Sequence, residues 1–133
     1  VNVCIGTDGC ASSNNLDIQE AMKTSALFQK AWRDDPSALP IPELMNMATV
    51  NGAKALRLDA GRIEEGAVAD ISIVDTDNSF FLSHGSFLAN FVYSAHSDCI
   101  DSVICNGKFL MRHREVEGEK EILKEARRVL SKI

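Results

Sequence analysis

Asp8 is the residue near the start of the chain whose type and position could do chemistry. It follows an apolar run at residues 1–5, and it is followed by Gly9 and a loop of small polar residues. A short continuous apolar run predicts a strand that is buried on both faces, as in parallel sheets. Enzymes built on parallel strands hold catalytic groups just beyond the carboxyl ends of those strands. Because Asp-Gly also makes ordinary turns, a turn without catalytic function is the alternative from spacing alone.

A helix is expected to follow this loop. Asp17 can cap it, with Glu20 in the position whose side chain reaches back to the cap. From Ile18 to Trp32 the apolar residues recur at helical spacing, which predicts that one face of the helix is buried. The run Asp34-Asp35-Pro36 ends the helix.

Two shorter helical segments are expected next. Pro40-Ile41-Pro42 suits the first turn of a helix, and the apolar side of that helix carries Leu44, Met45, Met47 and Ala48. Asn51-Gly52 is interpreted as a break, after which residues 53–58 form a further helical piece.

The second half of the chain is expected to be rich in β-structure. A β-branched run within residues 66–75 predicts a strand. Residues 100–105 and 108–112 flank Asn106-Gly107, the dipeptide most favoured for a tight type I′ turn, so they predict a hairpin. Residues 76–90 are expected to be irregular and held to the sheet by Phe80, Phe81, Phe87 and Phe91. A final helix carries an apolar stripe of Ile122, Ala126, Val129, Leu130 and Ile133.

Composition and charge narrow the class of protein. The chain has 133 residues and a formal net charge of −5, so it lacks the basic surface that nucleic-acid binding requires. No apolar run approaches the roughly 20 residues of a membrane-spanning helix, and a cytoplasmic protein without a membrane partner is expected. The four cysteines, Cys4, Cys10, Cys99 and Cys105, form no C-x-x-C pair and are expected to be reduced, with Cys4 and Cys105 buried in strands.

Four stretches of the sequence, taken in order, resemble the C-terminal part of the amidohydrolase superfamily. They are Gly6-Thr7-Asp8-Gly9, Ser13-Asn14-Asn15-Leu16-Asp17, the segment 48–56 (ATVNGAKAL) and the segment 66–71 (GAVADI). Within the superfamily these stretches are most similar to the methylthioadenosine and S-adenosylhomocysteine deaminases and to related chlorohydrolases.

The resemblance implies an α/β fold. The chain would be the C-terminal fragment of a (β/α)₈ metal-dependent hydrolase barrel, with its last strand and helices, joined to the C-terminal part of a β-sandwich domain. Residues 1–58 would form the last βα unit of the barrel and the helices after it, residues 59–113 the sandwich segment, and residues 114–133 the C-terminal helix.

The resemblance also implies a reaction. In the family, the aspartate that matches Asp8 is both a metal ligand and a catalytic residue that accepts a proton from the metal-bound water. The cofactor would be one divalent metal, zinc or iron. The substrate would be a small molecule with an aminated heteroaromatic ring, and the resemblance favours an adenosine derivative. The enzyme would hydrolyse a C–N or C–Cl bond of that ring.

The histidines of this chain match none of the ligand motifs of that family. Those ligands are a His-x-His pair and single histidines on earlier strands, whereas His84, His96 and His113 lie singly in or beside the β-rich part. A catalytic metal site usually needs about three protein ligands. We therefore expect these residues alone to bind no metal and to be inactive, with exposed barrel edges through which a homo-oligomer could form.

Other interpretations stay open at this stage. A guanine, cytosine or triazine hydrolase of the same superfamily would share Asp8. A self-standing, non-catalytic assembly or binding domain would instead have a closed core, with residues 1–5 paired on both sides. A second copy or a separate chain that supplies the missing strands is the third alternative.

Overall fold

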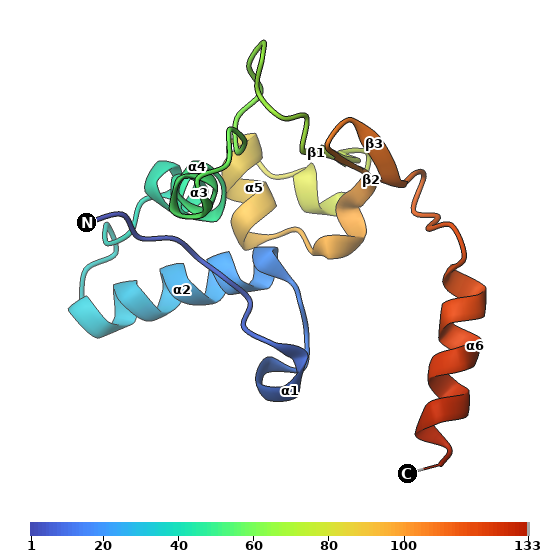
Figure 1. Ribbon diagram of the computed structural model, residues 1–133. Coiled ribbons are helices and arrows are strands. Elements are labelled where there is room, and N and C mark those ends of the chain that lie inside the picture. Colours follow the sequence, from blue (N-terminus) through green and yellow to red (C-terminus); the bar gives the residue numbers. More distant parts are fainter. Residues whose placement is uncertain (133) are drawn as a thin grey trace.

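The computed structural model describes residues 1–132 and combines helices with one small sheet (Figure 1). The α-helices are α1 (Cys10–Ser13), α2 (Ile18–Arg33), α3 (Ile41–Ala48), α4 (Val50–Leu56), α5 (Phe87–Tyr93) and α6 (Glu119–Leu130). The strands are β1 (Ile71–Val74), β2 (Ile100–Cys105) and β3 (Lys108–Met111), and two 3₁₀ turns are η1 (Ser79–Phe81) and η2 (Ser97–Cys99). The mixed content of helix and strand agrees with the α/β class.

Helix α2 begins and ends where its sequence predicts. The Asp17 carboxylate accepts hydrogen bonds from the backbone N–H groups of Gln19 and Glu20 at 2.9 and 3.1 Å, so it caps the helix. Asp34 ends the helix in the left-handed conformation, with φ of 50°. The prediction that Glu20 reaches back to the cap is wrong, because its carboxylate accepts a 2.6 Å hydrogen bond from Asn15 Nδ2.

The apolar face of α2 is only partly buried. Met22 and Ala26 are buried, but Phe28 and Trp32 are 60% and 77% exposed and stack on one another with ring centroids 6.1 Å apart. The prediction of one continuous buried face is therefore wrong for the outer half of α2. No other described element covers these two rings.

Helices α3 and α4 meet at Thr49 and not at the expected break. Thr49 has φ of −128° and ψ of −88°, which interrupts the helix, while Asn51 and Gly52 lie inside α4. A glycine two residues after a helix start is tolerated, so the Asn-Gly pair marks no boundary here. Gly61 packs closely on this junction, since a Cβ there would lie 2.9 Å from the Thr49 carbonyl carbon.

The sheet is antiparallel in the order β1-β2-β3. Ile71 lies opposite Ile104, and Val103 lies opposite Met111. Asn106 and Gly107 both have positive φ, at 47° and 75°, as a type I′ turn requires, so the predicted hairpin is confirmed.

The segment between β1 and β2 is more regular than expected. It contains η1 and the helix α5, which Ser86 caps by accepting a hydrogen bond from the Ala89 N–H at 3.2 Å. Phe81, Phe87 and Phe91 stack in series with centroid distances of 5.6 and 5.9 Å. The aromatic rings thus join η1 to α5.

The core of the described residues is small. Its buried apolar cluster consists of Met22 and Ala26 from α2, Leu44 from α3 and Val92 from α5. Gln19 is also buried, and its side-chain amide donates a hydrogen bond to the Phe91 carbonyl oxygen, which joins α2 to α5. The three helices therefore hold one another in place.

Residues 1–5 do not form the predicted buried strand. They run extended beside α3 and α4 without a sheet partner among the described residues, and Val3 is 50% exposed. A parallel strand is held by its neighbours, and none of the three strands pairs with this segment. A closed domain in which residues 1–5 are paired on both sides is contradicted.

The cysteines are free, as expected, but their burial differs from the prediction. Cys99 is buried, whereas Cys4, Cys10 and Cys105 are exposed. Cys4 is exposed because its segment joins no sheet, and Cys105 is exposed at the turn end of β2. None of the helices described within residues 1–132 is both long and apolar enough to cross a membrane.

Candidate active site

Asp8 lies in an exposed loop between the extended segment and α1, and two neighbours fix its carboxylate. The Gly9 N–H donates a 2.6 Å hydrogen bond to Oδ1, and the Ser12 hydroxyl donates a 2.7 Å hydrogen bond to Oδ2. The hydroxyl of Ser12, and next the amide of Gly9, hold the pKa of this carboxyl below its usual range. The Asp8 side chain is therefore ionised at neutral pH and open to solvent.

The backbone at Asp8 adopts an unusual conformation for a residue with a side chain. Its φ is 61°, in the left-handed region that most residues avoid. The residue before Asp8 is also held in place, because the Ser13 hydroxyl donates a 2.8 Å hydrogen bond to the Thr7 carbonyl oxygen. Hydroxyls of Ser12 and Ser13 thus hold both sides of the left-handed bend.

Helices α3 and α4 hold the extended segment that leads to Asp8. The Ile5 N–H donates a 3.0 Å hydrogen bond to the Met47 carbonyl oxygen. The side chain of Asn51 donates to the Val3 carbonyl oxygen at 2.7 Å, and the Asn2 side chain donates to the Asn51 carbonyl oxygen at 3.0 Å. The Asn51-Gly52 pair predicts a break in the helix, and no local pattern in the sequence indicates that Asn51 contacts residues 2 and 3.

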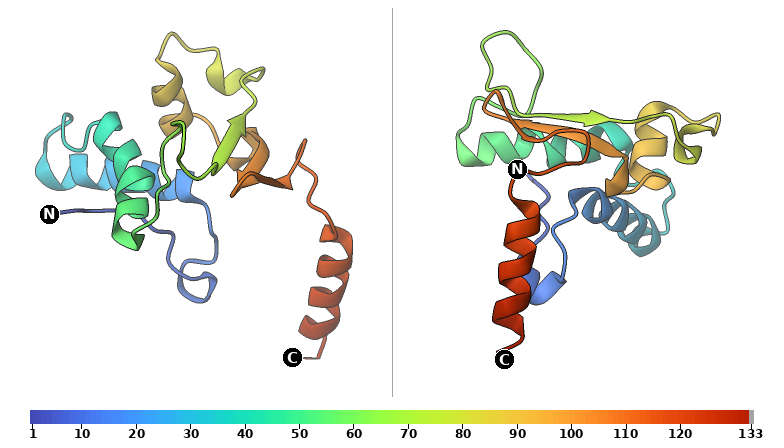
Figure 2. Two further views of the ribbon diagram at one scale, coloured as in Figure 1. Left: turned by 45° about the horizontal axis from the view of Figure 1, so that its top comes forward. Right: turned by 90° about the vertical axis from the view of Figure 1, so that its right-hand side faces the viewer.

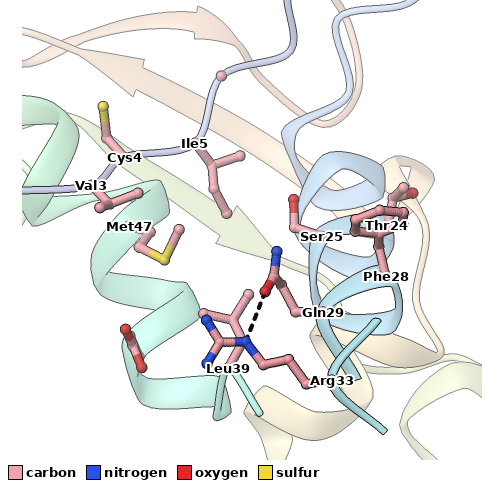
Figure 3. A pocket seen from close by; sticks show the side chains of 12 residues that line it. Val3, Cys4, Ile5, Thr24, Ser25, Phe28, Gln29, Arg33, Leu39 and Met47 are labelled. Carbon is pink, nitrogen blue, oxygen red and sulfur yellow. Dashed lines mark hydrogen bonds between the residues drawn. The ribbon is translucent and has the colours of Figure 1, made fainter. Parts of the chain in front are cut away.

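A groove of about 650 Å³ runs beside this segment (Figure 3). The segment borders it with Val3, Cys4 and Ile5, and α2 and its neighbours border it with Thr24, Ser25, Phe28, Gln29, Arg33, Leu39 and Met47. Arg33 donates a 3.3 Å hydrogen bond to Gln29 and supplies a cationic side chain to the wall. Asp8 does not line this groove, so the groove is the open space between the segment and α2 and not the setting of the Asp8 carboxylate.

The described residues, 1–132, offer the Asp8 carboxylate as one possible metal ligand and no complete metal site. Among residues 1–132, no three histidine, cysteine, aspartate or glutamate side chains gather where they could share one ion. His96 packs edge-on against Phe80 at a centroid distance of 5.3 Å, and His113 Nδ1 lies 3.3 Å from the Asp101 carboxylate. Asp8 belongs to no such group among the described residues, and its exposed, ionised carboxylate offers a single anionic donor.

Comparison with known families identifies the class. The model of the amidohydrolase family matches residues 1–110, and the chain belongs to that family. The match includes Asp8, the loop after it, helices α2 to α5 and the sheet as far as β3.

The most informative relatives are deaminases. The chain is 46% identical over 125 residues to a 5'-deoxyadenosine deaminase of Methanoregula boonei, covering 94% of this chain and 28% of that protein. It is 42% identical over 135 residues to a 5-methylthioadenosine/S-adenosylhomocysteine deaminase of Aquifex aeolicus, covering 100% of this chain and 31% of that protein. The chain spans between 28% and 32% of the length of the curated relatives it matches.

Solved structures agree. An adenosine deaminase from Xanthomonas campestris with bound zinc superposes with a TM-score of 0.93 at 32% identity, covering 99% of this chain and 31% of that chain. A zinc complex of an atrazine chlorohydrolase from Arthrobacter aurescens superposes with a TM-score of 0.72 at 26% identity, covering 88% of this chain and 27% of that chain. The resemblance inferred from the sequence motifs is confirmed at the level of the family.

Proposed function

We propose that this chain is the C-terminal portion of a metal-dependent amidohydrolase that removes the amino group of an adenosine derivative as ammonia. Water replaces the amine at the ring carbon, so that the C–N bond breaks and a C–O bond forms. Deamination is favoured over dechlorination because identity to the named deaminases is 42% and 46%, against 26% to the atrazine chlorohydrolase. We further propose the barrel and sandwich architecture, a cytoplasmic location and a small-molecule substrate.

The position and the hydrogen bonds of the Asp8 carboxylate support a catalytic function for this residue. The carboxylate is ionised, exposed and fixed by Gly9 and Ser12, at the end of a segment that α3 and α4 hold in place. A fixed, ionised carboxylate can accept a proton from an attacking water and return it to a leaving amine. Such proton transfer contributes about 10²- to 10⁴-fold to a rate.

A divalent ion, zinc or iron, is part of the proposal for the whole enzyme. Asp8 would provide one of its ligands, and the others would come from polypeptide outside these residues. When bound, such an ion activates water toward nucleophilic attack. Because one carboxylate is not enough to hold the ion, we propose that residues 1–133 alone are inactive.

The test uses the longer enzyme that contains these residues. Ammonia release is measured with 5'-deoxyadenosine, 5-methylthioadenosine and S-adenosylhomocysteine, and chloride release is measured with atrazine. We expect ammonia from at least one nucleoside and a loss of about 10²-fold or more in Asp8→Asn. The matched control is Asp17→Asn, an isosteric change nine residues along the chain that keeps the helix cap, and it should retain activity.

The results that would contradict the proposal are specific. Chloride release without ammonia would favour a chlorohydrolase of the same family. No product from any of the four compounds, or full activity in Asp8→Asn, would overturn the proposed reaction or the function of Asp8, respectively.

A further inference from the structure

Helix α6 carries an apolar surface that nothing in the described chain covers. The α6 stripe, defined here as Ile122, Leu123, Ala126, Val129 and Leu130, recurs at helical spacing along one face. Ile122 and Leu130 are 63% and 68% exposed, and no residue of α6 is buried. Figures 1 and 2 show α6 projecting from the end of the sheet, apart from α2 to α5.

The charges of α6 do not explain its position. Glu119 and Glu121 lie in its first turn and Arg127 and Arg128 in its last, which suits the helix dipole. Arg128 forms an ion pair with Glu125 within the same helix. These interactions favour helix formation locally, but none of them orients α6 relative to the rest of the chain.

The interactions within an uncovered helix of this kind do not fix its orientation relative to the rest of the chain. Isolated helices shorter than about 12–15 residues are marginal in water, and most helical stability in proteins comes from packing of an apolar face. Helix α6 has 12 residues. A fixed pose for α6 therefore requires a surface for the stripe to contact.

The comparison with a longer chain shows that the pose is shared. The adenosine deaminase from Xanthomonas campestris superposes over 99% of this chain with a TM-score of 0.93, so the superposed part includes α6. This chain covers only 31% of that protein. The same helix pose thus occurs in a polypeptide about three times as long.

The total surface points to a large missing contact. The chain exposes 9921 Å², whereas a compact monomer of 14.5 kDa exposes roughly 6,900 Å². The described chain therefore exposes roughly 3,000 Å² more than a compact monomer of its mass. Helix α6 contributes four of the exposed large apolar side chains, Ile122, Leu123, Val129 and Leu130.

We propose that the α6 stripe docks on an apolar surface of the polypeptide that precedes residue 1 in the longer enzyme, within the same copy. This inference rests on the proposed function only in taking the chain to be the C-terminal portion of that enzyme. Helix α6 then acts as a clamp that ties the end of the chain back to the upstream part of the fold. The family match ends at residue 110, so the clamp lies outside the matched family region.

The test is hydrogen exchange of α6 in the longer enzyme, read by mass spectrometry. In Leu123→Gln/Leu130→Gln we expect α6 amides to exchange roughly tenfold faster or more, because the docked face is lost. The matched control is Glu121→Gln/Lys124→Gln, which also introduces two glutamines without changing net charge, but on the opposite face of α6. Its exchange should match that of the unmodified enzyme.

Crosslinking from the lysines of α6 identifies what it contacts. Crosslinks from Lys120 and Lys124 to residues preceding Val1, within particles of monomer mass, would support the proposal. Crosslinks between copies, with a mass that falls in the Leu123→Gln/Leu130→Gln variant, would overturn it in favour of a homo-oligomer. Fast exchange of α6 in an enzyme that releases ammonia would also overturn the clamp while leaving the proposed reaction intact. Slow exchange of α6 in an enzyme that releases no ammonia would overturn the proposed reaction while leaving the clamp intact.

Discussion

Leu44→Ala is the substitution that most directly tests how the core supports the segment leading to Asp8. Leu44 is 0% exposed and packs with Met22, Ala26 and Val92. Replacing a buried leucine with alanine costs about 2–5 kcal/mol, and the cost grows with the cavity that is left. Because this cluster is small and bordered by partly buried side chains, we expect partial collapse and a loss of about 3 kcal/mol.

The measurement is urea unfolding followed by far-ultraviolet circular dichroism. Fluorescence is less suitable, because Trp32 is 77% exposed and reports poorly on burial. The unfolding midpoint should fall while the dependence on urea stays unchanged. The control is Leu82→Ala at a side chain that is 81% exposed, which should change the free energy of unfolding by no more than about 0.5 kcal/mol.

A second readout connects the core to the site. Leu44 and Met47 lie on the same helix, and the Met47 carbonyl oxygen accepts the hydrogen bond from the Ile5 N–H. If that bond opens only when α3 unfolds, a loss of about 3 kcal/mol should speed exchange of the Ile5 amide by about a hundredfold. A loss below about 1 kcal/mol, or unchanged exchange at Ile5, would refute the view that α3 carries both the core and the segment.

Two further predictions concern the helix cap and one ion pair. Asp17→Ala should lower the free energy of unfolding by about 1 kcal/mol in urea unfolding. Asp17→Asn should keep most of that free energy, because asparagine also caps helices. Equal losses in both variants would refute the cap. The Arg114 guanidinium, 2.8 Å from the Asp75 carboxylate, holds the pKa of Asp75 below its ordinary value of 3.8. Because the pKa of Asp75 is lowered in the folded state, its ion pair stabilises the fold fully above pH 3.8 and loses this effect as the pH falls below 3.8. The melting temperatures of the unmodified protein and of Asp75→Asn should therefore converge on acidification below pH 3.8.

Features determined by neighbouring residues could be read from the sequence. Asp17 caps α2 through N–H groups two and three residues away. Asn106-Gly107 closes the hairpin because these two residues tolerate positive φ. Helix α5 also has a local signal, the Ser86 cap before Phe87, which the expectation of an irregular segment at residues 76–90 does not use. Interactions of this short range need no knowledge of the rest of the fold.

Features that depend on distant surfaces could not be read in the same way. The apolar run at residues 1–5 predicts burial, but burial requires strands beside it, and none of the described strands pairs with it. Phe28, Trp32 and the α6 stripe have the spacing of core residues and are exposed for the same reason. Ile133, the last residue of the predicted stripe, lies outside the described residues. Asn51 differs from these residues, because it forms contacts that its local sequence does not predict. Its hydrogen bonds with residues 2 and 3 follow only from the fold.

The choice between a catalytic carboxylate and a simple turn at Asp8 depends on what the conformation stabilises. The left-handed conformation costs most residues about 1–2 kcal/mol, but aspartate adopts it more readily when its side chain forms local hydrogen bonds, as Asp8 does. In a turn, a closing hydrogen bond and a buried neighbour offset that cost, yet Asp8 is exposed and its carboxylate bonds only to Gly9 and Ser12. The bend is held by local hydrogen bonds from Gly9, Ser12 and Ser13, and it leaves the ionised carboxylate exposed to solvent. The proposal that Asp8 acts on a ligand therefore depends on its fixed, ionised and exposed carboxylate and not on backbone strain, because Asp34 adopts a similar φ as a helix cap.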